Sequence, residues 1–200
     1  LKGSIMLSQK WCYCPIDTLH SKKHELSIWT SIDISDIICT NNRFGENEMR
    51  KIIKEAFVVI GKEGSTLDGA GFIQKLWNDA NSHFSEVEHL AKKDTKGNLV
   101  GIWGAMSDFS HAFMPWEDGF SNGLYLAGVE CVADAEAPEG WTKWTIPSYE
   151  YIVVENHHGV FEETIRHMEE KGISLAGAVH DYTDPTTGTC YMYFPIRKVE

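Results

Sequence analysis

Two carboxylates in the last third of the chain lie among aromatic residues, and this combination suits the binding of a cation. Glu130 ends the segment Tyr125-Leu-Ala-Gly-Val-Glu130, and Asp181 stands beside Tyr182 just before a turn. A buried carboxylate supplies negative charge, and the faces of nearby rings attract a cation through their π electrons. A cleft lined by rings and one acid therefore fits a lipophilic cation or a planar drug-like molecule.

Aromatic residues recur at alternate positions of the expected strands, so that they share a face. Tyr149 and Tyr151 are two residues apart, and so are Tyr191 and Tyr193. Stacking on a ligand is one interpretation of these rings, and packing with the hydroxyl at the surface is the other. The residues predicted to contact a ligand are Trp103, Trp116, Tyr125, Glu130, Tyr149, Tyr151, Asp181, Tyr182 and Tyr191.

Glu130 and Asp181 are also the two candidates for a catalytic group. Glu130 shares a strand face with Leu126 and Gly128, where a carboxylate needs a partner or a ligand unless it reaches solvent at the strand end. Asp181 is the other candidate, and its alternative role is to cap the turn that leads to Asp184. The residues alone leave this choice open.

Neither a metal nor a cofactor is expected. Cys12, Cys14, His20 and His24 are zinc-ligand types, but their spacing is not that of a zinc finger. The segment Gly61-Lys-Glu-Gly-Ser65 lacks the spacing of a phosphate-binding loop. No Gly-x-Ser-x-Gly motif is present to support a serine hydrolase.

The composition restricts the classes of function. The chain has 200 residues and a net charge of -11, and this acidity disfavours direct contact with nucleic acid. No run approaches 18 apolar residues, so we expect no membrane span. The first residues do not form a signal peptide and Asn-x-Ser/Thr sites are absent, which together favour a cytoplasmic protein.

The hydrophobic pattern predicts an α+β fold in which one order of elements occurs twice. A polar, turn-rich break near residues 41–49 separates an N-terminal extension or linker (1–45) from the main domain (50–200). Strands at 55–61, 99–107 and 123–132 surround a helix at 68–84. Strands at 141–155, 174–182 and 189–196 then surround a helix at 160–171. Pro147 predicts a bulge or an edge inside the long strand 141–155.

Several short segments in order resemble the GyrI-like (gyrase-inhibitor-like) effector-binding domain. This domain occurs alone, as in integron-cassette drug-binding proteins, or behind the DNA-binding modules of AraC and MerR regulators. The resemblance covers roughly residues 50–200, and its order and spacing are more specific than any one segment. The segments are Phe57-Val-Val-Ile-Gly61, Leu76-Trp77, Ile102-Trp-Gly104, Leu126-Ala-Gly-Val-Glu130, Pro138-Glu-Gly140, Thr145-Ile-Pro147 with Tyr151, and Tyr193-Phe-Pro-Ile196.

The resemblance implies two repeats related by a pseudo-two-fold axis, an antiparallel sheet with helices on one side, and a central ligand cleft. It also implies a buried acid in a Phe-Glu-x-Tyr-like setting just before the last hairpin. This chain has Val179-His-Asp-Tyr182 there, so Asp181 would stand in for the glutamate with a side chain one methylene shorter. Glu130, which matches the family's Gly-Val-Glu strand, is the alternative.

Three functions follow as hypotheses. The first is a small-molecule sensor of a bacterial transcription regulator, or a stand-alone drug-binding protein, without enzymatic activity. The second is a hydrolase of strained-ring, DNA-alkylating compounds on the same fold, with Glu130 or Asp181 as the acid. The third is a protein-interaction module. The expected partner is an aromatic or cationic small molecule, and a homodimer and a missing DNA-binding domain are compatible with the sequence.

Overall fold

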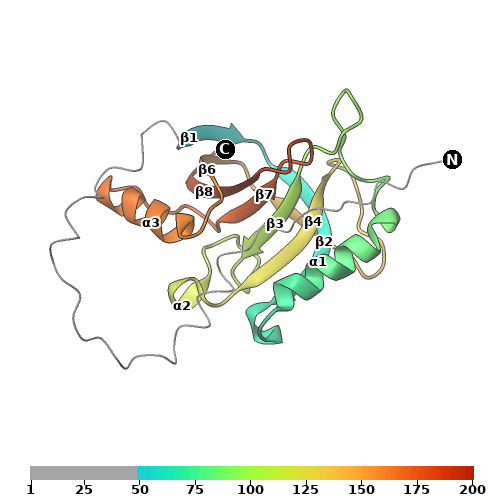
Figure 1. The fold of residues 1–200 in the computed structure, drawn as a ribbon, viewed down its shortest axis with the longest axis horizontal. Coiled ribbons are helices and arrows are strands. Elements are labelled where there is room, and N and C mark those ends of the chain that lie inside the picture. The colour runs from blue at the N-terminus through green and yellow to red at the C-terminus, as the bar shows by residue number, and fades with distance from the viewer. Residues whose placement is uncertain (1–48) are drawn as a thin grey trace.

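The computed structural model describes residues 49–200, which form one eight-stranded antiparallel sheet and two main helices (Figure 1). The strands lie in the order β1-β6-β8-β7-β3-β4-β2-β5. They are β1 (Arg50–Lys54), β2 (Phe57–Ser65), β3 (Ile102–Ser107), β4 (Leu124–Cys131), β5 (Thr142–Ile146), β6 (Tyr149–Glu155), β7 (His180–Thr183) and β8 (Cys190–Lys198). The helices are α1 (Phe72–Ser82), the short α2 (Glu117–Phe120) and α3 (Val160–Glu170), with 3-10 turns at Thr66–Asp68 and Phe84–Glu86.

Two repeats of strand, helix, strand and strand make up this sheet. The first is β2-α1-β3-β4 and the second is β6-α3-β7-β8, and their strands are arranged as β2-β4-β3 and β6-β8-β7. The pairing of β3 with β7 joins the two halves at the centre of the sheet. The α+β fold with a pseudo-two-fold arrangement, predicted from the sequence, is therefore confirmed.

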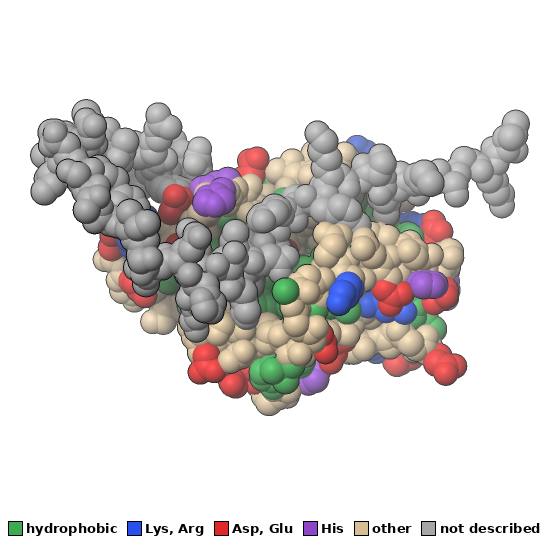
Figure 2. Space-filling view, turned by 60° about the horizontal axis from the view of Figure 1, so that its bottom comes forward, with side chains coloured by type: hydrophobic (Ala, Val, Ile, Leu, Met, Phe, Trp, Pro, Cys, Tyr) green, Lys and Arg blue, Asp and Glu red, His purple; other side chains and the backbone are tan. Residues whose placement is uncertain are grey.

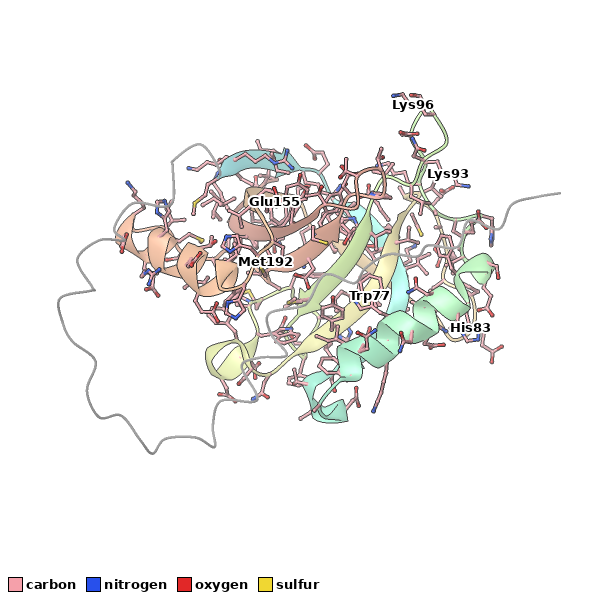
Figure 3. All side chains as sticks on the ribbon, viewed as in Figure 1. Trp77, His83, Lys93, Lys96, Glu155 and Met192 are labelled. Atoms are coloured by element: carbon pink, nitrogen blue, oxygen red, sulfur yellow. The ribbon has the colours of Figure 1, made fainter. Side chains whose placement is uncertain are left out.

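The two main helices cover the same face of the sheet. α1 buries Phe72, Ile73 and Ala80, and α3 buries Val160 and Phe161 among other residues. Figure 1 shows α1 in front of β2 and α3 beside the other half of the sheet, and Figure 3 shows Trp77 on the side of α1 that faces the sheet. We call this side of the sheet the helix face and the opposite side the aromatic face.

Strand register decides which residues lie on each face. Val58 and Ile60 of β2 pack in the core beneath α1, and Met192 of β8 packs beneath α3. Their neighbours in sequence, such as Val59 and Tyr193, lie on the aromatic face. Because side chains alternate along a strand, the pairing of the strands assigns every strand residue to one face or the other.

A pair of glycines brings β2 and β4 into close contact. Gly61 lies directly opposite Gly128 in the register. A Cβ atom at Gly128 would overlap the carbonyl oxygen of Ile60 and the Cα of Gly61. Only glycine fits at this position, because the obstructing atoms belong to the backbone and have little freedom to move.

We expect Gly128→Ala to lower the free energy of unfolding by about 2 kcal/mol, the usual range for overpacking. Urea denaturation would measure the loss. Gly64→Ala is the matched control on the same pair of strands, because a Cβ there meets only the side-chain ends of Leu76 and Asp68. Equal losses in the two variants would contradict the close-contact explanation.

Two strand predictions need correction. Residues 141–155 are not one bulged strand, because β5 ends at Ile146 and β6 begins at Tyr149. Pro147, which lacks an N–H group, lies in the break between them. β5 pairs with β2 at one edge of the sheet, whereas β6 pairs with β1 and β8 near the other. The strand predicted at 174–182 is also too long, since β7 covers only His180–Thr183.

The predicted extension at residues 1–45 lies outside the described residues, as do Cys12, Cys14, His20 and His24. The division into an extension and a main domain therefore stays a prediction. Within residues 49–200, no helix is long and apolar enough to cross a membrane.

Candidate functional site

The aromatic face carries a connected group of rings that comes from six strands. Trp103 of β3 lies at its centre, with ring centroids 4.7 Å from Phe57, 4.8 Å from Tyr182 and 5.0 Å from Tyr193. Its members are Phe57, Trp103, Trp144, Tyr149, Tyr151, Tyr182, Tyr191 and Tyr193. These rings offer the apolar, polarisable surface that an aromatic ligand or a cation requires.

Burial keeps the hydroxyls of this group protonated. It raises the pKa of Tyr149, Tyr151, Tyr182 and Tyr193 above the ordinary value of 10. These tyrosines are therefore neutral near pH 7 and act as hydrogen-bond donors or acceptors rather than as phenolates.

Glu130 is the acid of the aromatic face, and its carboxylate is almost completely buried, at 1% exposed. The Nζ atoms of Lys54 and Lys92 each lie 3.0 Å from one of its oxygens. The indole N–H of Trp103 donates a third hydrogen bond to it, 3.2 Å long. A buried carboxylate needs such partners, so the expectation of a partner or a ligand for Glu130 is met here by the chain's own cations.

Lys54 places an ammonium group over the rings as well as against Glu130. Its Nζ lies 4.2 Å from the ring centroid of Phe57 and 5.2 Å from that of Trp103. Both distances are within the range of a cation–π interaction. The edge strand β1 therefore already places the ammonium group of Lys54 over rings of the aromatic face, and it places the guanidinium of Arg50 5.0 Å from the ring centroid of Tyr191.

Asp181 lies on the other side of the sheet from Glu130. It pairs in register with Gly104 and Met192, which both belong to the helix face. The Tyr125 hydroxyl donates to it at 3.3 Å and accepts from the indole N–H of Trp77 at 3.2 Å. Glu130 and Asp181 are thus not alternatives for the same position, and Asp181 belongs to a polar cluster beneath α1.

The predicted ligand-contact residues divide between the two faces. Trp103, Glu130, Tyr149, Tyr151, Tyr182 and Tyr191 come together on the aromatic face. Tyr125 and Trp116 pack on the helix face, where the Trp116 indole donates to the Leu124 carbonyl at 2.9 Å. One face of the sheet therefore carries six of the nine predicted residues.

His180 occupies the place on the aromatic face that the sequence analysis gave to Asp181. It is completely buried, lies opposite Tyr193 in the register, and has its ring centroid 6.3 Å from that of Tyr151. Two-residue alternation from Tyr182 leads to His180, so the sequence did contain this signal. The predicted contact residues also omit Lys54 and Lys92, because neither stands in a motif, and the rings of Phe57, Trp144 and Tyr193.

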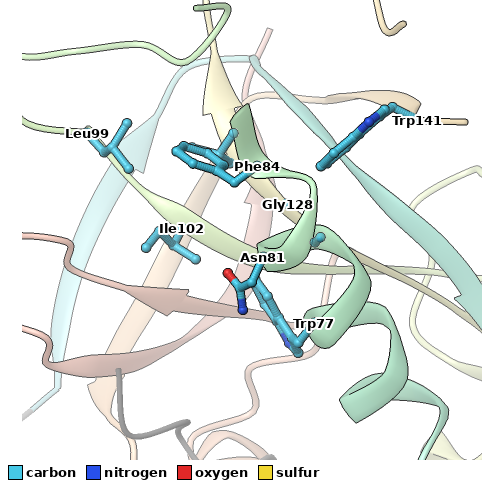
Figure 4. Close-up of a pocket in the computed structure, with 9 residues that line it drawn as sticks. Trp77, Asn81, Phe84, Leu99, Ile102, Gly128 and Trp141 are labelled. Carbon is cyan, nitrogen blue, oxygen red and sulfur yellow. The ribbon is translucent and has the colours of Figure 1, made fainter. Parts of the chain in front are cut away.

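A separate pocket of about 340 Å³, part of it open solvent, lies between α1 and the sheet on the helix face (Figure 4). Its walls are apolar apart from Asn81 and include Trp77, Phe84 and Trp141. No charged side chain lines it, so this pocket suits a small apolar group and lacks the chemistry to hold a cation.

Charge outside the site is mainly negative. Figure 2 shows acidic side chains at several places around the described surface, in keeping with the net charge of -11. Such a surface attracts cations from solution. Among residues 49–200, no group of three or more His, Cys, Asp or Glu side chains could hold a metal ion.

Comparisons with known proteins find similarity at the level of structure. No protein-family model and no curated protein matches the chain. The structure of SAV2435 bound to tetraphenylphosphonium matches with a TM-score of 0.52 at 15% identity, over 75% of this chain and 94% of that one. The cryo-EM structure of an EcmrR–DNA complex matches with a TM-score of 0.51 at 12% identity, over 76% of this chain and 59% of that one. At such identities the likeness concerns the fold, and the described part of the chain has the fold of the GyrI-like effector-binding domain.

Proposed function

We propose that this protein binds a lipophilic cation on the aromatic face and acts as a sensor or a drug-binding protein in the cytoplasm. The observation that carries the proposal is the ammonium group of Lys54, held between the Glu130 carboxylate and the rings of Phe57 and Trp103. Because the carboxylate and the rings stabilise this cation, they have the charge and the ring surface to stabilise the cation of a ligand.

Lys54 is placed so that a ligand can replace it. It ends the edge strand β1, and its side chain is 21% exposed while Glu130 is 1% exposed. A lysine side chain is long and flexible, and its ammonium group is well solvated in water. The ammonium can therefore move outward to solvent. The buried Glu130 would keep its contacts with Lys92 and Trp103, and the cation of the ligand would take the place of Lys54.

The fold also supports this proposal. SAV2435 was solved with tetraphenylphosphonium, a lipophilic cation, and EcmrR was solved in complex with DNA. If this chain is part of a regulator, its ligand would act by favouring one of two arrangements of an attached DNA-binding domain. Residues 1–45 would then be the linker to that domain.

Titration with tetraphenylphosphonium, followed by tryptophan fluorescence and calorimetry, tests the proposal. We expect saturable binding that Glu130→Gln weakens about tenfold, because the amide removes the charge but keeps the shape. Asp181→Asn is the matched control. It makes the same chemical change on the helix face and should alter the affinity by less than about twofold.

Three results would overturn the proposal. They are the absence of binding, equal weakening in the two variants, and weakening by Asp181→Asn alone. Mass spectrometry of a strained-ring electrophile incubated with the protein separates binding from turnover. A hydrolysed product that accumulates in excess over the protein would establish the hydrolase alternative instead.

A further inference from the structure

The centre of the sheet, where β3 and β7 separate, contains a histidine with a defined tautomer. β3 and β7 pair as far as Gly104 and Asp181. Beyond that point the Met106 N–H donates to Nδ1 of His180 at 3.1 Å rather than to a strand carbonyl. Because Nδ1 accepts this hydrogen bond, the proton of the neutral imidazole lies on Nε2.

Two polar atoms on neighbouring rings of the aromatic face have no hydrogen-bond partner among the described residues. Nε2 of His180 and the hydroxyl oxygen of Tyr151 are both buried without a partner among the described residues. Burial lowers the pKa of His180 to about 3 and raises that of Tyr151, so each carries a proton at neutral pH. The protein thus holds two buried, unpaired donors on neighbouring rings, an arrangement that costs free energy unless something accepts from them.

We propose that the His180 Nε2–H and the Tyr151 hydroxyl donate hydrogen bonds to a neutral acceptor oxygen of the ligand. This inference rests on the proposed function and extends it, because it specifies a second feature of the ligand. The preferred ligand is a lipophilic cation that also carries a ketone, amide or ether oxygen. Glu130 attracts the charged end, and the donor pair selects for the oxygen.

The two donors should discriminate between ligands rather than attract all of them. The two rings are neighbours, with centroids 6.3 Å apart, and the proposal places one ligand oxygen within reach of both donors. A ligand without an acceptor leaves both donors buried and unpaired, whereas one with an acceptor pairs them. The remaining aromatic face consists mainly of rings and aliphatic side chains, so few other groups on it would fix the orientation of a ligand.

A matched pair of probes tests the inference. The first is (4-oxo-4-phenylbutyl)triphenylphosphonium, which carries one ketone, and the second is (4-phenylbutyl)triphenylphosphonium, which lacks it. We expect wild-type protein to prefer the ketone by about tenfold. Tyr151→Phe and His180→Asn should each reduce this preference to about threefold or less, and the double variant should abolish it. Asn is chosen because its side-chain oxygen can still accept from the Met106 N–H.

The outcomes separate this inference from the proposed function. Equal affinity of the wild type for the two probes overturns the donor pair but leaves the cation site in place, and it would indicate that water occupies the donors. A preference that persists in both variants also overturns it. Failure of both probes and of tetraphenylphosphonium overturns the proposed function itself, and the inference with it.

A second measurement needs no ligand. Long-range ¹H–¹⁵N correlation spectra report which imidazole nitrogen carries the proton, and His180→Asn assigns the signal. We expect the Nε2–H tautomer in the free protein. The Nδ1–H tautomer would overturn the inference, because Nε2 would then be an acceptor.

Discussion

Lowering the pH from 7 to 4 is expected to remove about 3 kcal/mol of the free energy of unfolding through His180 alone. Burial lowers the pKa of this imidazole from 6.5 to about 3 in the folded protein. Between these values the unfolded chain binds a proton that the folded protein does not. The contribution of His180 is therefore complete above pH 6.5 and is lost as the pH falls toward 3.

His180→Asn isolates this contribution from that of the many carboxylates. The variant cannot titrate in this range but keeps an acceptor for the Met106 N–H, and its neighbours Tyr151 and Tyr193 stay neutral throughout. Urea denaturation from pH 7 to pH 4 should give a flatter curve for the variant than for the wild type. Parallel curves would contradict this expectation, because they would show that the folded and unfolded imidazole take up a proton over the same pH range.

Local patterns were sufficient to predict most of the elements. The apolar positions that recur every three or four residues predicted both main helices, and α3 matches its predicted range of 160–171 to within one residue. The strand predicted at 141–155 failed for a different reason. Ile146 and Tyr149 are both apolar and extended. Ile146 pairs with Phe57 of β2 and Tyr149 pairs with Lys54 of β1, and only this difference in pairing places them on different strands. Such pairing is not visible in a local pattern.

The composition of the site was harder to predict than the fold. Asp181 and Tyr125 are the residue types that a cation site uses, yet both lie on the helix face, where they bond to each other. A shift of one residue along a strand moves a side chain through the sheet, so residue type without register cannot assign a face. Alternation from Tyr182 would have selected His180, but an imidazole was not among the expected groups.

Lys54, one of the two lysine partners of Glu130, could not be predicted from the sequence for another reason. Lys54 lies 76 residues before Glu130 and belongs to β1, a strand outside both repeats. Lysines are common on surfaces, and no motif marks this one. Only the assembled sheet, which places the end of β1 beside β6, brings this ammonium group over Phe57.

Removing that ammonium group should make the protein a tighter binder. We expect Lys54→Ala to raise the affinity for tetraphenylphosphonium about 30-fold, which corresponds to about 2 kcal/mol. In the wild type, the ligand must first separate Lys54 from Glu130. In the variant, the carboxylate oxygen that Lys54 contacts and the ring of Phe57 are available at once, while Lys92 keeps the other oxygen. The free variant should also be less stable, and the added ligand should restore the loss.

Two control variants test whether competition between Lys54 and the ligand causes the gain in affinity. Lys51→Ala removes the same charge from the same strand, but Lys51 is exposed and points to the opposite face. The affinity of this variant for tetraphenylphosphonium should therefore match that of the wild type. Lys54→Arg keeps a cation that can pair with Glu130 at two points, and it should bind the ligand no better than the wild type. Equal gains in Lys51→Ala and Lys54→Ala would attribute the effect to net charge. A weaker Lys54→Ala would mean that the lysine supports the ligand instead of competing with it, and that Glu130 holds both cations together.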